Sequence, residues 1–374
     1  MRPVLIVGAG KIGASIAKLL VHSGDYDVTL ADRDAAALQR VAARAPVRTL
    51  ALRASDADGL AASLAGQSAV LSATSFDANP AIARAALASG ASYFDLTEDV
   101  ATTRKIRNLA RRAAPRQIFM PQCGLAPGFI GILAADLAHR FDTLDTVKMR
   151  VGALPQYPNN PIMYNLTWST DGLINEYCNA CEAIVDGQRR DVQALEGLEH
   201  FALDGLEYEA FNTSGGLGTL CETLAQRVHT LNYKTVRYTG HRYLMDFLVN
   251  GLRLGASRAG RRQLKTMLEY AVPITLQDVV LVFVSVSGMI DGQFRQITDA
   301  RKIYHRELFG EAWSAIQLTT AASACAVIDL HFDGELNGDG HGFVAQEQVS
   351  LDRFLANRFG RYYAIDRYAE EIPI

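Results

Sequence analysis

The chain has 374 residues, and its 37 lysines and arginines against 40 aspartates and glutamates give a formal net charge of −3. A protein whose main function is nucleic-acid binding needs a basic excess for the phosphates, so this balance argues against that class. Hydrophobic residues make up 49% of the chain, which argues against a disordered protein and allows about two domains.

The N-terminus and the cysteines bear on where the protein works. No stretch approaches the roughly 18 apolar residues that a membrane helix requires. The apolar residues 1–7 run directly into glycines, which predicts a buried strand rather than a signal peptide. The five cysteines show no disulfide framework. We therefore expect a cytoplasmic protein that has neither a membrane nor a nucleic acid as its partner.

Strands and helices alternate through the first third of the chain. Short apolar runs predict buried strands, and each is followed by a segment with the apolar spacing of a helix. The expected strands cover residues 4–7, 28–31, 47–52, 69–73, 92–96 and 117–120, and the expected helices cover 14–22, 34–45, 56–64, 79–89 and 102–114. This alternation predicts an α/β fold with a doubly wound parallel sheet of the Rossmann type.

The pattern changes after Gly128. A helix is expected over 129–141 and a strand over 146–152, while residues 234–238 and the β-branched run 279–286 predict a mixed or antiparallel sheet. A long helix of small apolar residues is expected over 313–330. We therefore expect a first domain at 1–128, a second domain at 129–310, and a C-terminal segment, 311–374, whose long helix could pack back on the first domain.

The first expected strand runs into a G-x-G-x-x-G motif that opens a helix. In this context the motif is typical of a dinucleotide site: Gly8 permits the tight turn, Gly10 lets the backbone approach the pyrophosphate, and Gly13 allows close packing of the helix. Lys11 and Ile12 lie at the helix N-terminus, whose free N–H groups favour a phosphate. A tight turn without a ligand would need the same glycines.

The end of the second strand bears on the choice of cofactor. Asp32 would accept the ribose hydroxyls and repel a 2′-phosphate, so it favours NAD. The neighbouring Arg33 can hold that phosphate and keeps NADP as the alternative. Ligands bind at the carboxyl edge of such sheets, so we also assign side chains at other strand ends to the cofactor. These are Asp56, Ala73, Thr74 and Ser75. For Asp56, capping the following helix is an equally good explanation.

Several blocks of sequence resemble the saccharopine dehydrogenase family. CGLAPG at 123–128 resembles the family's turn after the sixth strand, and MYNLTWS at 163–169, EAFNTSGG at 209–216 and LNYKTVRYTGH at 231–241 resemble its bacterial lysine 6-dehydrogenase branch. The resemblance covers nearly the whole chain. It implies that 1–128 is an NAD(P)-binding Rossmann domain, that 129–310 is an inserted α+β mixed-sheet domain for the substrate and for dimerisation, and that 311–374 returns to the first domain. It also implies a nicotinamide-linked amine dehydrogenase or imine reductase of lysine metabolism that forms a homodimer. One departure is Thr97-Glu98, where the lysine 6-dehydrogenases carry a glycine pair and a histidine, so the substrate stays open.

An amino-acid substrate needs a cation for its carboxylate and groups that handle protons. Arg237 is our candidate for the carboxylate, because strand alternation places it on one face with Tyr233 and leaves Val236 for the core. A surface arginine in a salt bridge is the alternative. Glu98 is expected to bind the amine or act as a base, with a solvated loop acid as its alternative. His241 is expected to shuttle a proton, with a satisfied structural histidine as its alternative.

Other side chains are assigned to substrate binding. The loop that holds Thr213 and Ser214 offers backbone N–H groups to a carboxylate, although a helix cap explains it equally well. The remaining substrate candidates are Thr97, Tyr164 and Tyr233.

A metal site is not expected, because Cys178 and Cys181 have no second pair at metal spacing. Two other functions compete with an amino-acid dehydrogenase. One is a saccharopine or opine-type reductase that joins an amino acid and an aldehyde, and the other is an NAD-binding protein without turnover.

Overall fold

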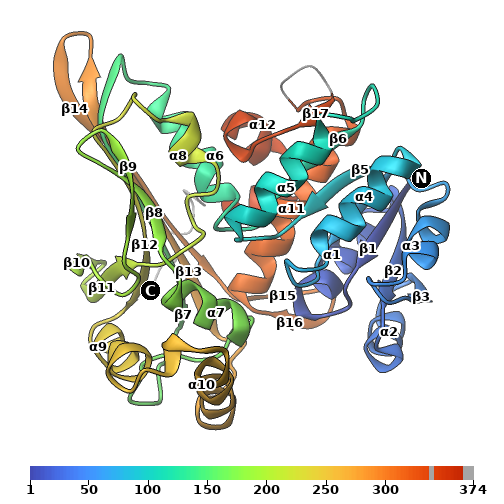
Figure 1. Cartoon of the computed structure of the whole chain (residues 1–374), viewed down its shortest axis with the longest axis horizontal. Coiled ribbons are helices and arrows are strands. Elements are labelled where there is room, and N and C mark those ends of the chain that lie inside the picture. Colours follow the sequence, from blue (N-terminus) through green and yellow to red (C-terminus); the bar gives the residue numbers. More distant parts are fainter. Residues whose placement is uncertain (337–340, 365–374) are drawn as a thin grey trace, which may run out of the picture.

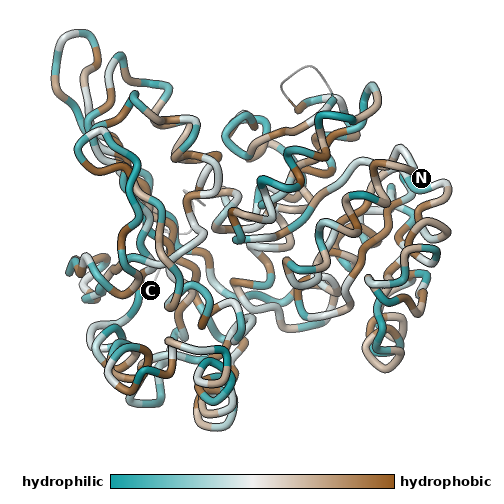
Figure 2. Tube along the Cα trace, viewed as in Figure 1, coloured by the Kyte–Doolittle hydropathy of each residue, from teal (hydrophilic) through white to brown (hydrophobic). Residues whose placement is uncertain are grey.

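The computed structural model describes residues 1–336 and 341–364. Two lobes, each built on its own sheet, lie side by side with one long helix, α11 (Ala315–Phe332), between them (Figure 1). Hydrophobic residues gather along the strands of both lobes (Figure 2). Residues 365–374 of the expected C-terminal segment lie outside the described residues.

The first lobe is a parallel sheet of seven strands in the order β17-β6-β5-β4-β1-β2-β3. Its strands are β1 (Arg2–Val7), β2 (Tyr26–Asp32), β3 (Arg48–Ala51), β4 (Ala69–Ser72), β5 (Ser92–Asp95), β6 (Ile118–Met120) and β17 (Gly342–Phe343). Its helices are α1 (Lys11–His22), α2 (Ala35–Ala42), α3 (Ala57–Leu64), α4 (Asn79–Ser89) and α5 (Val100–Ala110). The expectation of a doubly wound parallel sheet is therefore confirmed.

Side chains at the helix ends explain where these helices start and stop. Asp34 caps α2, and Asp99 caps α5 by accepting the N–H of Thr102 at 2.6 Å. Asp56 caps α3 through the N–H of Gly59 at 3.0 Å, which is one of the two roles that the sequence left open for it. Gly90 ends α4 in the left-handed conformation.

The second lobe is a mixed sheet of eight strands that follows α6 (Phe129–Ala138). Six strands lie in the order β10-β11-β12-β7-β13-β14, while β8 pairs with β12 and with β9. The strands are β7 (Thr143–Pro155), β8 (Cys181–Val185), β9 (Gln188–Val192), β10 (Glu199–Leu203), β11 (Leu206–Asn212), β12 (Thr230–Tyr238), β13 (Asp278–Ile290) and β14 (Gln293–Tyr304). Because β12 is parallel to β7 and antiparallel to β11, the mixed sheet is confirmed.

Short elements complete this lobe. The helical ones are α7 (Thr170–Cys178), α8 (Leu220–Thr223), α9 (His241–Asp246), η1 (Phe247–Gly251), η2 (Leu254–Ala256) and α10 (Arg258–Ala271). A separate hairpin of β15 (Arg306–Leu308) and β16 (Glu311–Trp313) precedes α11. Trp313 therefore ends a strand and does not begin the expected helix, which starts two residues later with Ser314 as its cap.

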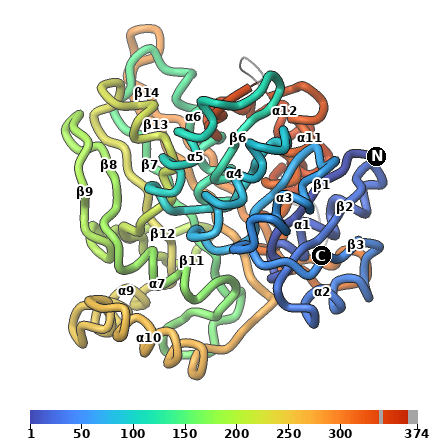
Figure 3. The backbone as a smooth tube through the Cα atoms, turned by 45° about the vertical axis from the view of Figure 1, so that its right-hand side comes forward, coloured from blue at the N-terminus to red at the C-terminus, as the bar shows by residue number. Residues whose placement is uncertain are grey.

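One hydrophobic core joins the two lobes through α11. This helix contacts α1 of the first lobe and β13 of the second, and the contact with α1 can be followed from a second direction (Figures 1 and 3). Its alanines at 321, 322, 324 and 326 are fully buried, and such small side chains let neighbouring elements approach closely. The remaining C-terminal elements are η3 (Gln346–Gln348), α12 (Leu351–Ala356) and η4 (Gly360–Tyr363).

α11 is also long and apolar enough, by length and composition, to cross a membrane. The expectation that no stretch reaches this limit is therefore wrong for this segment. However, 72% of its apolar window is buried inside the protein, as in a core helix, so it is weak evidence for a membrane span.

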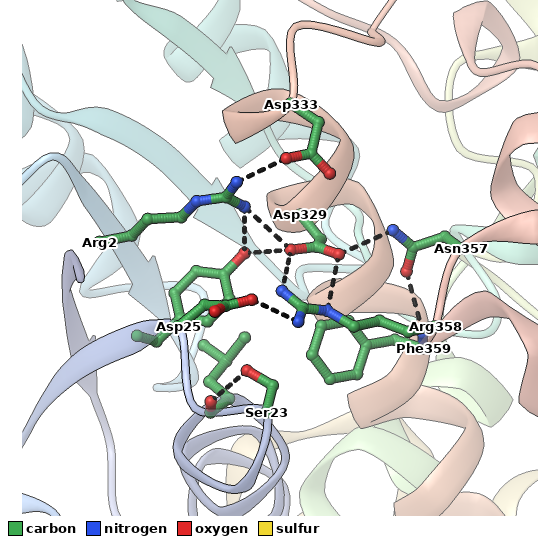
Figure 4. A network of polar contacts seen from close by, with 10 residues as sticks. Arg2, Ser23, Asp25, Asp329, Asp333, Asn357, Arg358 and Phe359 are labelled. Atoms are coloured by element: carbon green, nitrogen blue, oxygen red, sulfur yellow. Dashed lines mark hydrogen bonds and ion pairs between the residues drawn. The ribbon is translucent and has the colours of Figure 1, made fainter.

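A buried carboxylate joins the two ends of the described chain (Figure 4). Asp329 of α11 accepts hydrogen bonds from Tyr26 at 2.6 Å, Arg358 at 2.7 Å, Asn357 at 2.9 Å and Arg2 at 3.1 Å. Burial alone would raise the pKa of Asp329, but the hydrogen bonds from Arg358, Tyr26 and Asn357 outweigh it and lower the pKa. β17 adds a second link because it pairs with β6.

We predict that Asp329→Asn destabilises the protein by about 3 kcal/mol, because Arg358 and Arg2 lose their shared carboxylate. The folded pKa of Asp329 lies below its ordinary value of 3.8. The contribution of Asp329 to the free energy of unfolding is therefore complete above its ordinary pKa. This contribution is lost as the pH falls through the folded pKa.

Urea unfolding at pH 7 and at lower pH measures this effect. Asp333→Asn is the control, since Asp333 is exposed and bonds only Arg2 among these groups, so its loss should cost about 1 kcal/mol or less. Equal effects of the two substitutions at pH 7 would contradict the prediction.

Candidate functional site

The loop between β1 and α1 has the shape of a dinucleotide cradle. Gly8 has a φ of 113°, and a Cβ there would lie 2.6 Å from the carbonyl oxygen of Ala73. A Cβ at Gly13 would lie 1.9 Å from the carbonyl oxygen of Gly8, so only glycine fits at both positions. At Gly10 a Cβ would meet nothing within 4 Å, so this side of the loop is open to a ligand.

Asp32 holds the loop in this shape. Its carboxylate accepts the N–H of Ala9 at 2.6 Å and the N–H of Asp34 at 2.8 Å, and Arg33 lies exposed beside it. α1 begins at Lys11 without a side-chain cap, which leaves its first turn available to an anion. These residues fit the pyrophosphate and ribose of a nicotinamide dinucleotide.

A cavity of about 570 Å³ joins the cradle to the second sheet. It brings predicted cofactor residues and predicted substrate residues to one space, although they come from different lobes. The predicted residues that line it are Ile12, Ala73, Thr74, Ser75, Thr97, Glu98, Tyr233 and Arg237.

Arg237 of β12 is a buried cation in this cavity. It is 2% exposed; its Nε donates to the Tyr177 hydroxyl at 3.0 Å and its Nη1 to the Val236 carbonyl at 2.8 Å. No ion pair joins it to a carboxylate among residues 1–336 and 341–364, so the alternative of a surface salt bridge is wrong. A buried charge without a counter-ion is costly, which indicates a site for an anionic ligand.

The surroundings of Arg237 keep it charged. Burial works against the charge, but Tyr177, Tyr164 and Glu176 raise the pKa of Arg237 above its ordinary value. The guanidinium carbon also lies 4.9 Å from the centroid of the Tyr164 ring, as in a cation–π contact.

Glu176 of α7 is a candidate that the sequence reasoning missed. The helix places it beside Leu173 and Tyr177 on its buried face, and its side chain lines the cavity. The pKa of Glu176 is raised to about 8. Burial is the largest cause; the charge of Arg237 lowers this pKa, and Glu98 raises it. An acid with such a pKa can exchange a proton near neutral pH. The available signal was an acid on the apolar face of a helix.

Glu98 lies in the same cavity, in the loop after β5. Burial raises its pKa, while hydrogen bonds from its own backbone and from Asn175 lower it. A Cβ at Gly215 would lie 2.7 Å from the Cβ of Glu98, so the glycine loop packs directly on this residue. Glu98 is therefore half-buried and held in place, unlike a fully solvated loop acid.

His241 does not reach the cavity. It is fully buried behind Arg237, where its Nε2 bonds the Tyr177 hydroxyl at 3.0 Å and its Nδ1 bonds the carbonyl oxygen of Ile162 at 2.8 Å. Burial and then the charge of Arg237 lower its pKa to about 3. This position does not support the predicted proton shuttle and fits the alternative of a structural histidine.

Three predicted substrate residues also lie away from the main cavity. Tyr164 is buried against Arg237, and its hydroxyl accepts a hydrogen bond from Trp168 at 3.0 Å. Thr213 and Ser214 line a separate pocket of about 160 Å³ beside Glu98. Their contact with a substrate carboxylate stays a prediction. The alternative of a helix cap is wrong, because α8 begins several residues later without a side-chain cap.

The cysteines of the described segments supply no reactive group. Cys123 is fully buried, which raises its pKa well above the ordinary value. Cys178 ends α7 and Cys181 begins β8, and both thiols are free. Within residues 1–336 and 341–364, no group of three or more His, Cys, Asp and Glu side chains is placed to hold a metal ion.

The fold and the site together define the class of dinucleotide-dependent oxidoreductases with an inserted substrate lobe. Residues 4–119 match the model of the saccharopine dehydrogenase NADP binding domain, and residues 124–359 match the saccharopine dehydrogenase C-terminal domain. The chain therefore belongs to the saccharopine dehydrogenase family, and the resemblance seen in its sequence is confirmed. Membership in this family supports the expected NAD(P)-dependent oxidoreductase. The family's first domain is named an NADP binding domain, and NADP is the alternative cofactor that Arg33 kept open.

Saccharopine dehydrogenase from Saccharomyces cerevisiae is similar to this chain both in sequence and in structure. Saccharopine dehydrogenase (NADP(+), L-glutamate-forming) is 25% identical over 202 residues, which are 51% of this chain and 44% of that protein. The match therefore spans less than half of that relative's length. The structure of apo saccharopine dehydrogenase (L-Glu forming) has a TM-score of 0.76 at 18% identity and covers 95% of this chain and 96% of its own, which shows a shared fold.

Another similar structure is C. glutamicum DAP dehydrogenase in complex with DAP. It has a TM-score of 0.48 and 11% identity, and the match covers 98% of this chain and 99% of that one.

We predict that Gly10→Ala weakens NADPH binding without affecting the fold. Gly10 has a φ of −69°, which any residue adopts, and its added methyl group would meet no protein atom within 4 Å. The methyl group would instead lie where the cofactor approaches the backbone, at a cost of about 1–3 kcal/mol.

Titration calorimetry with NADPH measures this loss, and thermal unfolding checks the fold. Gly13→Ala is the contrasting variant, because its Cβ would clash with Gly8 and lower the melting temperature. Wild-type affinity in Gly10→Ala would show that the cofactor does not use this loop.

We also predict that ionisation of Glu176 lowers stability as the pH rises. Its pKa is about 8 in the folded protein against an ordinary 4.5, so between these values only the folded state holds the proton. Stability therefore falls over this range, by at most about 1.4 kcal/mol per pH unit.

Glu176→Gln cannot ionise and should remove this slope. Urea unfolding of both proteins at pH 5 and pH 8 isolates the effect, because all other titrating groups are shared. Parallel pH profiles would contradict the raised pKa.

Proposed function

We propose that this chain is an NAD(P)-dependent oxidoreductase that acts on a C–N bond of a small diamino acid, in the manner of a lysine 6-dehydrogenase. The observation that carries this proposal is Arg237, a buried cation that forms no ion pair within the described part of the chain and shares one cavity with two half-buried acids. A diamino acid has a carboxylate to match the cation and an amine to match the acids. Lysine metabolism and a homodimer, which the family resemblance implies, stay predictions.

The residues of the cavity divide the work of such a reaction. Arg237 would bind the carboxylate through the nitrogen atoms that its protein contacts leave free. Glu98 would hold the positive charge of the substrate amine. The ionised form of Glu176, which a pKa of about 8 makes accessible near neutral pH, would take the proton that the nitrogen loses.

The overall reaction balances with water as a second reactant. When bound, the nicotinamide cofactor accepts a hydride from the carbon that bears nitrogen. The N–H proton goes to Glu176, and the substrate becomes an imine. Water then adds to the carbon of the imine, the C–N bond breaks, and ammonia and an aldehyde leave.

A second candidate is a saccharopine dehydrogenase that forms glutamate, as the name of the yeast relative states for that protein. Its substrate carries three carboxylates, so it needs more cations. Two other guanidinium groups line the cavity: Arg261 already donates to Gly255, Asn179 and Cys178, and Arg262 lies exposed. Of these three guanidinium groups Arg237 alone is buried, which supports a substrate with one buried carboxylate.

A panel of substrates tests the choice. We expect the full-length protein to reduce NAD or NADP with lysine, ornithine or diaminobutyrate, and not with polyamines, which lack the carboxylate that Arg237 would bind. Absorbance of the reduced nicotinamide measures turnover.

Two other outcomes of the panel would favour the competing functions. Turnover of saccharopine alone would favour the glutamate-forming enzyme. If no compound is oxidised while NADPH still raises the melting temperature, the protein binds the cofactor without this chemistry.

A further inference from the structure

A line of buried hydrogen bonds leads from the cavity into the second lobe. It starts at the Nε of Arg237, which lies 3.0 Å from the Tyr177 hydroxyl, and continues from that hydroxyl to the Nε2 of His241, also at 3.0 Å. It ends where the Nδ1 of His241 meets the carbonyl oxygen of Ile162 at 2.8 Å. These groups come from β12, α7, α9 and the loop after β7.

The direction of every bond in this line follows from its two ends. The carbonyl oxygen of Ile162 can only accept, so Nδ1 of His241 carries a hydrogen and donates it. The Nε of Arg237 can only donate, so the Tyr177 oxygen accepts there and turns its own hydrogen toward His241. Nε2 of His241 is therefore the acceptor, and the ring is neutral. The lowered pKa of His241 agrees with this form.

Packing holds this line rigid. The Tyr177 ring meets the His241 ring edge to face at 5.9 Å between centroids, and the Tyr164 ring lies 5.3 Å from the His241 ring. Phe211 stacks on the far side of His241 at 6.3 Å. A histidine so enclosed cannot turn away from Tyr177.

These contacts leave Arg237 one orientation. Tyr177 holds its Nε, and the Val236 carbonyl holds its Nη1. Its Nη2 donates to no atom of the described segments, and the residue lines the cavity. The free edge of the guanidinium group is therefore the edge available to a ligand.

We propose that Tyr177 and His241 are positioning residues that set the orientation of Arg237, and through it the selection of substrates that bear a carboxylate. This proposal rests on the proposed function, in which Arg237 binds that carboxylate. Neither positioning residue touches the substrate, since neither lines the cavity. Their effect should appear in affinity for the amino acid and in discrimination against an amine without a carboxylate.

Three substitutions separate the hydrogen bond from the packing. Tyr177→Phe keeps the ring and removes the hydroxyl. His241→Asn can still donate to Ile162 but has no acceptor near the Nε2 position, whereas the side-chain oxygen of His241→Gln can accept from Tyr177 at that position. Arg237→Ala is included as the reference for loss of the carboxylate site.

The measurement is the dissociation constant of L-lysine, L-saccharopine and cadaverine for the full-length protein with NADPH, by titration calorimetry. We take whichever of the two amino acids binds wild type more tightly. Tyr177→Phe and His241→Asn should raise its dissociation constant roughly tenfold, and His241→Gln should stay within about threefold of wild type. Cadaverine, which has no carboxylate, should bind wild type, Tyr177→Phe and the two His241 variants alike. In steady-state kinetics the loss should appear in KM, with kcat within about twofold.

Several results would overturn the proposal. If Arg237→Ala weakens binding while Tyr177→Phe and His241→Asn do not, the positioning role is wrong and the proposed function stands. If His241→Gln binds the amino acid as weakly as His241→Asn, the hydrogen-bond acceptor at the Nε2 position does not set the affinity. If Arg237→Ala has no effect, or neither amino acid binds wild type, both proposals fail. Thermal unfolding checks each variant, and Tyr177→Phe carries the test if a His241 variant does not fold.

Discussion

The central constraint in this protein is a buried guanidinium group that forms no ion pair with any carboxylate of the described residues. Removing a charge from water costs several kcal/mol unless other groups replace its hydration, so Arg237 must be held by fixed dipoles. The Tyr177 hydroxyl, the Val236 carbonyl and the face of the Tyr164 ring supply them. Arg237 lines the cavity, and we assign the free edge of its guanidinium group to the substrate's carboxylate.

The rest of the architecture keeps this cation opposite the cofactor cradle. The two sheets share one hydrophobic core through α11, whose small buried side chains let α1 and β13 approach from either side. Asp329 then links this helix to β1, β2 and the C-terminal segment. Because the cavity lies where the two lobes meet, its shape depends on this shared packing rather than on any single domain.

Membership in the saccharopine dehydrogenase family establishes the cofactor lobe and the class of chemistry, but the substrate depends on few side chains. Here these are one buried arginine from β12 and two acids, Glu98 after β5 and Glu176 on α7. The pKa values of both acids are raised, and burial is the largest cause for each. An environment that raises the pKa of a carboxyl group toward neutrality is the ordinary way in which proteins prepare a proton acceptor.

Much of the fold could be predicted from the order of residues, because the causes are local. Apolar runs between glycines indicated the strands of the first sheet, the G-x-G-x-x-G spacing indicated the cradle, and alternation along β12 put Tyr233 and Arg237 on one face. The raised pKa of Glu176 and the burial of His241 could not be predicted, since both arise from packing in the folded chain: burial raises the pKa of Glu176, and His241 bonds the distant Ile162. Burial and charge at a site are properties of the packed chain, and only tertiary structure brings those neighbours together.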